Sequence, residues 1–257
     1  MTTLKSLPGS RGAPAPGRRA APGGVRAYLQ QSREPLTALI AVLPLFVAYQ
    51  LGILVAGGAR NGVDFVSDLL HLAFQGSMLG YLIFNGVVLA GFFGAVVYLR
   101  RNGELHPRLL PMMLVESAIY ALLVGGVDNT LIHVTGLSGL LAAGGSAPGF
   151  ITKIVLSAGA GLYEELVFRL FLMGGLFYAL HRIAGIGRFG AAAVAVVASS
   201  LIFSAAHHIV EPFTMNAFVF RFFAGVVFAA LFQVRGFAIA VWTHVLYDVW
   251  VMVFLGK

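Results

Sequence analysis

Three groups of polar side chains lie inside apolar stretches of the C-terminal half, and their residue types and spacing suit acid–base hydrolysis. The groups are Glu164-Glu165-x-x-x-Arg169, Phe203-x-x-x-His207 and His244-x-x-x-Asp248. A buried glutamate beside a histidine can take a proton from water. A second histidine and another polar side chain can donate hydrogen bonds to the oxyanion of a tetrahedral intermediate. The three groups together therefore predict hydrolysis by an activated water.

The first group separates two carboxylates by role. Glu165 and Arg169 are four residues apart on a helix, in the favourable order of acid before base, so they are expected to form an ion pair. Glu164 is rotated by about 100° from its neighbour, which leaves its carboxylate available for another task. A buried ion pair that only holds two helices together is the structural alternative for Glu165 and Arg169.

The histidine groups also have structural alternatives. Phe203 and His207 lie one above the other on a helix, and His207 alone would suit a hydrogen-bonded core residue. His208 fits that interpretation, or an interfacial one, better than His207 does. His244 and Asp248 share a helix face, and an internal hydrogen bond would satisfy both. The occurrence of three such groups on neighbouring apolar stretches favours a common site.

Two other hydrolytic mechanisms are weighed against this site. No G-x-S-x-G pattern and no cysteine occur, which argues against a Ser or Cys nucleophile. Zinc is the second option, with Glu164, His207 and His244 as the ligand set. The sequence has no H-E-x-x-H motif, however, and its His-His pair is adjacent, so these side chains diverge on a helix. We therefore expect no cofactor, with zinc as the disfavoured alternative.

The composition defines the elements that must position these side chains. The 257 residues are 59% hydrophobic and only 11% charged, with no cysteine. A soluble domain usually carries about 25% charged residues. The apolar content also excludes a disordered chain, and the missing cysteines exclude a disulfide scaffold. The chain is therefore predicted to be an all-α, polytopic membrane helix bundle with about seven to eight transmembrane helices.

The apolar runs predict where these helices lie. Runs near the length of about 20 residues that spans a bilayer occur at 35–57, 78–99, 109–127, 155–180, 190–208, 215–233 and 237–255. Residues 64–76 are shorter and amphipathic, which predicts an interfacial helix. The stretch 128–150 suits either a short re-entrant helix or a loop.

The basic residues predict the orientation. Residues 1–33 are rich in Pro, Gly, Ala and Arg, which is typical of a flexible basic cytoplasmic tail, and residues 34–257 form the predicted bundle. With the N-terminus in the cytoplasm, twelve Lys or Arg residues fall on the cytoplasmic side and three on the opposite side. This distribution follows the positive-inside rule. The formal net charge of +7 is thus explained by topology, and no nucleic-acid partner is needed.

The three motifs resemble the signature of the CPBP family, which contains the Ras-converting CAAX prenyl proteases and bacterial proteins long called the Abi family. The resemblance covers about 150–255. It implies an intramembrane bundle in which Glu164 and His207 activate water, while Glu165 and Arg169 form a supporting pair.

The resemblance also implies that His244 and the residue four positions later bind the oxyanion. The prenyl proteases have Asn where this chain has Asp248. An ionised Asp cannot donate a hydrogen bond, so Asp248 must carry a proton, which burial favours, or must orient His244.

The main hypothesis is an intramembrane endopeptidase that cleaves a membrane-associated or lipidated protein or peptide. It would reside in the bilayer, and the Ala- and Gly-rich composition suggests a bacterial inner membrane. The alternatives are a non-catalytic scaffold or bacteriocin-immunity protein of the same fold and, third, a proton-coupled transporter. Glu116 and Arg221, also inside apolar runs, receive no role, and the oligomeric state is not predicted.

Overall fold

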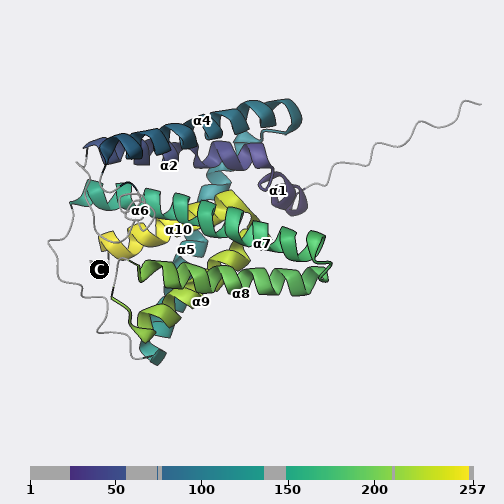
Figure 1. Cartoon of the computed structure of the whole chain (residues 1–257). Coiled ribbons are helices and arrows are strands. Elements are labelled where there is room, and N and C mark those ends of the chain that lie inside the picture. The colour runs from purple at the N-terminus through teal and green to yellow at the C-terminus, as the bar shows by residue number, and fades with distance from the viewer. Residues whose placement is uncertain (1–23, 56–73, 75–76, 136–148, 210–211, 255–257) are drawn as a thin grey trace, which may run out of the picture.

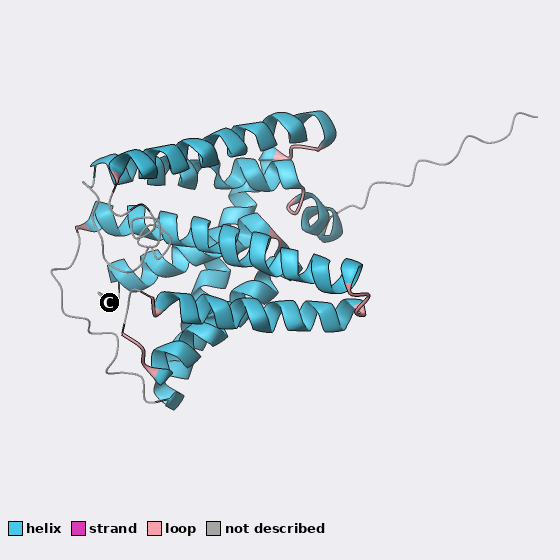
Figure 2. Ribbon diagram, in the orientation of Figure 1, coloured by secondary structure: helices cyan, strands magenta, loops and turns pink. Residues whose placement is uncertain are grey.

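The protein is a bundle of helices. A computed structural model describes residues 24–55, 74, 77–135, 149–209 and 212–254, and no strand occurs among these residues (Figures 1 and 2). In chain order the helices are α1 (Val25–Gln31), α2 (Pro35–Val55), α4 (Met78–Asn102), η1 (Pro107–Leu109), α5 (Leu110–Thr135), α6 (Phe150–Glu164), η3 (Glu165–Met173), α7 (Gly174–Tyr178), η4 (Ala179–Ile183), α8 (Arg188–His207), α9 (Met215–Arg235), α10 (Phe237–Val249) and η5 (Trp250–Phe254). Segments η3, η4 and η5 are π-helical, and η1 is a 3₁₀ turn. The predicted all-α polytopic fold is confirmed.

Six helical stretches in the described part of the chain are long and apolar enough to cross a membrane: Pro35–Gly52, Leu82–Asn102, Pro107–Val127, Phe150–Ile183, Arg188–His207 and Met215–Arg235. The seventh predicted span, 237–255, corresponds to the shorter apolar helix Phe237–Val253. The predicted interfacial helix at 64–76 lies almost wholly outside the described residues. So does most of 128–150, although α5 continues as a helix to Thr135.

The elements that carry the three motifs lie side by side. The run α6–η3–α7–η4 crosses the middle of Figure 1, with α8 packed below it and α2 and α4 above it. Helix α10 occupies the centre, in contact with α2, α5, α6 and α9. The apolar character of α10 thus has a second cause besides lipid, because most of its first two turns is buried against protein. Helix α4 contributes little buried surface and packs on α2.

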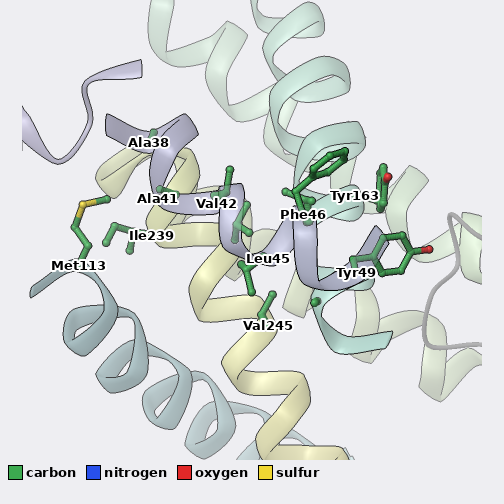
Figure 3. Close-up of a cluster of buried hydrophobic side chains, with 14 of the residues drawn as sticks. Ala38, Ala41, Val42, Leu45, Phe46, Tyr49, Met113, Tyr163, Ile239 and Val245 are labelled. Atoms are coloured by element: carbon green, nitrogen blue, oxygen red, sulfur yellow. The ribbon is translucent and has the colours of Figure 1, made fainter. Parts of the chain in front are cut away.

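The core lies where α2, α5, α6 and α10 meet (Figure 3). In the close-up, Leu45 of α2 lies near Val245 of α10, Phe46 lies toward Tyr163 of α6, and Met113 of α5 lies near Ile239. These side chains are at most 7% exposed. Tight packing here holds α10, which carries the third motif, against the helices on either side.

Glycines permit the closest helix contacts. A Cβ on Gly161 of α6 would lie 2.8 Å from the backbone nitrogen of Val245 on α10. A Cβ on Gly225 of α9 would lie 3.2 Å from the Cα of Ser200 on α8. Small residues bring helix backbones together in membranes, where dispersion contacts rather than the hydrophobic effect drive packing. Gly161 lies one turn before Glu164, and Val245 follows His244, so this contact sets the separation of two motifs.

The end of the predicted tail is structured. Residues Val25–Gln31 form helix α1, and Tyr28 is buried against the bundle. The Tyr28 hydroxyl donates a hydrogen bond to the Glu116 carboxylate of α5. Arg235, at the end of α9, binds the same carboxylate with Nε–Oε1 2.5 Å and Nη2–Oε2 2.8 Å, and its Nη2 also donates to Ser32 Oγ at 3.2 Å. We call Tyr28, Ser32, Glu116 and Arg235 the Glu116 cluster.

Candidate active site

The first motif lies where the helix changes its geometry. Glu164 is the last residue of α6, and Glu165 begins the π-helical segment η3. The Gly174 amide accordingly bonds to the Arg169 carbonyl, five residues earlier. A π-helix has a wider turn than an α-helix, and such segments occur often at functional sites. The two adjacent carboxylates on either side of this change, Glu164 and Glu165, are both buried.

Glu164 faces two histidines from two other helices. Its Oε1 lies 3.5 Å from Nε2 of His207, on α8, and its Oε2 lies 3.6 Å from Nε2 of His244, on α10. The three side chains are at most 9% exposed. One carboxylate is thus placed between two imidazole nitrogens at the meeting point of three helices.

Backbone and aromatic contacts orient His207. Its Nδ1 lies 2.9 Å from the Phe203 carbonyl one turn earlier, an acceptor that places the Nδ1 proton there. The Phe203 ring packs edge-on against the imidazole, with centroids 4.7 Å apart. These contacts leave Nε2 directed at Glu164. The neighbouring His208 turns elsewhere: its Nδ1 lies 3.2 Å from the Pro212 carbonyl, and its ring contacts Phe213.

A carboxylate orients His244 instead. Its Nδ1 lies 2.9 Å from Oε1 of Glu165, which can only accept when ionised, so this nitrogen is the donor. Its Nε2 faces Glu164 and lies 3.7 Å from Oδ2 of Asp248, one turn later on the same helix. Asp248 itself lies just before η5, the π-helical end of this helix. Both helices with acidic motif residues therefore change from α to π geometry at the site.

Arg169 lies one helical turn after Glu165 and contacts its carboxylate. Its Nε lies 3.4 Å from Glu165 Oε2, and the side chain is 2% exposed. The guanidinium carbon lies 4.4 Å from the centroid of the Phe203 ring and 5.8 Å from that of Phe228, both within the range of a cation–π contact. Its Nη1 and Nη2 atoms have no hydrogen-bond partner. The predicted ion pair is present, and aromatic rings replace the hydrogen bonds that a buried arginine usually has.

The seven side chains named from the sequence thus come together. They are Glu164, Glu165, Arg169, Phe203, His207, His244 and Asp248, which we call the Glu164 cluster. Among the described residues no group of three or more His, Asp or Glu side chains is arranged to hold a metal ion. Glu116 lies outside this cluster, bound to Arg235. Phe228 was not identified from the sequence, because α9 is rich in phenylalanine and gives no spacing signal.

The comparisons with known proteins agree with the motif analysis. No curated protein and no solved structure gives a significant match to the chain. A family model does match, over residues 146–250, and its description is "Type II CAAX prenyl endopeptidase Rce1-like". The matched stretch begins before α6 and ends after Asp248, so it contains the whole Glu164 cluster. Residues 146–250 of this chain are therefore similar to the Rce1-like family of type II CAAX prenyl endopeptidases.

Proposed function

We propose that the protein is an intramembrane endopeptidase in which Glu164 and His207 activate a water molecule. The observation that carries this proposal is the position of the Glu164 carboxylate, 3.5 and 3.6 Å from the Nε2 atoms of two buried histidines. A general base must lie within reach of the proton that it abstracts. A water molecule placed beside Glu164 Oε1 and His207 Nε2 can contact both atoms. The family match supports peptide-bond hydrolysis.

The proposed reaction has two proton transfers. Glu164 takes a proton from the water, whose oxygen attacks the carbonyl carbon and forms a tetrahedral oxyanion. When the oxyanion collapses, the C–N bond breaks, and the proton passes from Glu164, directly or through His207, to the leaving nitrogen. One water is consumed, and a carboxyl group and an amine are formed. No covalent intermediate with the enzyme is required.

His244 and Asp248 are the proposed ligands of the oxyanion. Because Nδ1 of His244 donates to Glu165, Nε2 is the atom left to face the substrate oxygen, and it donates a hydrogen bond there when the imidazole carries a proton on both nitrogens. Asp248 can donate only if its carboxyl carries a proton. Changing Asp248→Asn, the residue of the prenyl proteases, supplies a permanent donor and should retain activity. Asp248→Ala should lower kcat by about 100-fold, as the loss of one oxyanion donor does elsewhere.

The mechanism is proposed to run without a metal. The arrangement of His, Asp and Glu side chains supports this, since no described group of three suits a metal ion. Cleavage by the purified protein should then be insensitive to a strong chelator. If chelation abolishes activity and zinc restores it, Glu164, His207 and His244 are the candidate ligands, and the proposed base is wrong.

The proposed substrate is a membrane-associated or lipidated protein or peptide, reached from the bilayer. The family description and six membrane-length apolar helices in the described residues support this. We further propose that the N-terminus is cytoplasmic. This proposal is supported by five exposed arginines that lie at helix ends on the side that this orientation places in the cytoplasm: Arg100, Arg101, Arg108, Arg182 and Arg188.

The decisive experiment measures cleavage of a library of lipidated and transmembrane peptides by the purified protein in detergent. Glu164→Gln and His207→Ala should each lower kcat by at least about 100-fold, the usual contribution of general acid–base catalysis. Glu104→Gln, at an exposed glutamate, and His208→Ala, at the histidine that faces away, are the matched controls. Equal cleavage by Glu164→Gln and wild type would refute the mechanism.

The same experiment separates the alternatives. A scaffold or immunity protein of this fold would bind peptides but cleave none, and Glu164→Gln would leave binding unchanged. A proton-coupled transporter would acidify or alkalise the lumen of proteoliposomes when its substrate is added. The arrangement of a carboxylate between two histidines, with Glu165 holding one of them, favours the endopeptidase.

A further inference from the structure

His244 is held at its edge and also on its face. Its Nδ1 edge meets Glu165, while the Phe228 ring of α9 lies flat on the imidazole, with centroids 4.4 Å apart and an angle of 17° between the planes. Phe228 is 2% exposed and is held in turn by the edge of Tyr247, at 6.4 Å between centroids. Because Phe228 is buried and packed in this way, its ring is a fixed surface on which the His244 imidazole stacks.

The edge contact alone does not determine where Nε2 points. A single hydrogen bond at Nδ1 still lets the imidazole swing about χ2 and tilt about the bond, because its angular preference is broad. Nε2 is the ring nitrogen farther from the hydrogen bond, so a small rotation of the imidazole about Nδ1 displaces Nε2. An aromatic ring stacked on the face excludes those tilted positions at a distance typical of offset stacking. The two contacts together leave one orientation.

Arg169 connects the Phe228 ring to the other histidine. Its guanidinium lies over Phe203, which packs against His207, and within 5.8 Å of the Phe228 centroid. Each histidine therefore has one aromatic partner, and both partners contact the same cation. The two Nε2 atoms end at nearly equal distances from Glu164.

We propose that Phe228 is a positioning residue that sets the plane of the His244 imidazole and so aims Nε2 at the reacting carbonyl. The proposal rests on the proposed function, because the aim of Nε2 matters only if His244 binds the oxyanion. In this role Phe228 acts by its contact with the His244 ring. Its effect passes through His244, and that distinguishes it from the other buried phenylalanines of the core.

A magnetic resonance measurement tests the geometry without any substrate. The chain has seven histidines, so selective ¹³C,¹⁵N-histidine labelling gives a small set of ring signals, and His244→Gln identifies those of His244. Stacking at 4.4 Å places the His244 ring protons in the shielding region of Phe228. Phe228→Leu should move them downfield and broaden them, whereas the His207 signals should stay. Phe223→Leu, the same change at an exposed position of α9, is the control.

Kinetics then test the consequence. Phe228→Leu should lower kcat and kcat/KM together by about 10- to 100-fold with KM unchanged, as expected when a group that acts in the transition state is misplaced. Phe228→Tyr, which keeps the ring, should restore most of kcat. If Phe228→Leu does not fold, Phe228→Met, which keeps more volume, is measured in the same way.

The two proposals fail in different ways. If the wild type cleaves nothing, the proposed function is wrong, and the resonance experiment still decides whether Phe228 orients His244. If cleavage occurs but Phe228→Leu matches Phe223→Leu in both the His244 signals and kcat, the positioning role is wrong. If Phe228→Leu lowers the unfolding temperature but leaves kcat unchanged, the positioning role is also wrong, and Phe228 is a core residue only.

Discussion

Two glutamate–arginine pairs in the described part of the bundle are built differently: Glu165–Arg169 is fully buried, and Glu116–Arg235 is partly buried. In the Glu116 cluster, Arg235 forms a two-point contact with the carboxylate, and Tyr28 and Ser32 add hydrogen bonds. In the Glu164 cluster, Arg169 meets Glu165 through one contact at 3.4 Å, and two of its nitrogens and Glu165 Oε2 lack hydrogen-bond partners. In the Glu116–Arg235 pair one nitrogen, Nη1 of Arg235, lacks a hydrogen-bond partner, so this pair is the better satisfied of the two.

This difference in hydrogen bonding distinguishes a structural ion pair, in the Glu116 cluster, from the candidate active site, the Glu164 cluster. A two-point arginine–carboxylate contact is among the strongest hydrogen-bonded arrangements, so it suits a joint between α1, α5 and the α9–α10 corner. A half-satisfied polar network is costly for a buried region and persists where function requires it. In the Glu164 cluster the second oxygen of Glu165 is used for His244 rather than for Arg169. The following predictions test this contrast.

The largest effect is expected from removing each arginine. Arg235→Met leaves the partly buried Glu116 carboxylate without its cation, which should lower the free energy of unfolding by about 1.5–3 kcal/mol, the value of hydrogen bonds to a charged group, and leave kcat of the folded fraction unchanged. Arg169→Met should instead lower kcat, because Arg169 no longer holds the Glu165 carboxylate in the position where it accepts the hydrogen bond from His244. Thermal unfolding in detergent and single-turnover cleavage measure the two quantities. Equal stability losses with kcat unchanged in both variants would erase the contrast.

The second largest effect is expected when each glutamate of the two pairs is replaced by glutamine. Glu165→Gln replaces the charged acceptor of His244 Nδ1 and should lower kcat by about 100-fold or more, comparable to the loss of an oxyanion donor. Glu116→Gln should reduce stability and leave kcat unchanged. The measurement is cleavage rate per folded molecule, with the folded amount fixed by unfolding curves. A matching fall in kcat for Glu116→Gln would mean that the distant pair also acts on catalysis.

The spacing between the helices of the site should be sensitive to a single methyl group. Gly161→Ala places a Cβ 2.8 Å from the Val245 nitrogen, so α10 must move away from α6 and carry His244 from Glu164. A displacement near 1 Å can cost up to about 100-fold in rate. Gly175→Ala, where a Cβ meets nothing within 4 Å, is the control. Unchanged kcat in Gly161→Ala would show that the site tolerates a looser contact.

The smallest effect concerns Tyr28 and depends on pH. Burial, and then the hydrogen bond to Glu116, raise the pKa of the Tyr28 hydroxyl above its usual value of 10.0. Because the folded state holds this proton more tightly, its stabilisation is present below pH 10 and decreases as the pH rises above it. Tyr28→Phe should cost about 1.5 kcal/mol at neutral pH, the value of a hydrogen bond to a charged group. Its unfolding curve should also decline less between pH 9 and 11, about one unit either side of the usual tyrosine pKa.

The matched control for this prediction is Tyr98→Phe, at an exposed tyrosine of α4. It should follow the wild type at every pH. If Tyr28→Phe does the same, the α1 contact contributes nothing to the stability of the bundle.

Much of the site could be predicted from periodicity. The i, i+4 spacings of Glu165–Arg169, Phe203–His207 and His244–Asp248 place each pair on one helix face, and their cost in lipid predicts that they face the interior. The rotation of Glu164 away from Glu165 predicts that Arg169 pairs with Glu165, and in the structure Arg169 contacts Glu165 while Glu164 contacts His207. The two carboxylates nevertheless share His244. Apolar run lengths likewise predicted most of the helices.

The missed features all depend on contacts between distant segments. Helix α1 directly follows a Pro- and Gly-rich stretch, and its seven residues are too few to form a stable helix alone. Its stability comes from contacts of Tyr28 and Ser32 with residues about 90 and 200 positions away. The π-helical segments have no signature in a single sequence. Arg235 is one of the twelve basic residues predicted on the cytoplasmic side, yet it is 3% exposed, because Glu116 offers a partner that only the bundle brings near.

The sequence by itself determined which side chains cannot tolerate lipid, and hence which residues gather inside. Residue type and helical spacing suffice for that, because burial of charge is costly in any bundle. Only the tertiary structure decided how they share partners: that Glu164 lies between two histidines, that Glu165 divides its oxygens between His244 and Arg169, and that Phe228 covers the His244 ring. These choices follow from the close approach of α6 and α10 and the wider turn after Glu164, which depend on packing between helices and are not encoded in any local spacing.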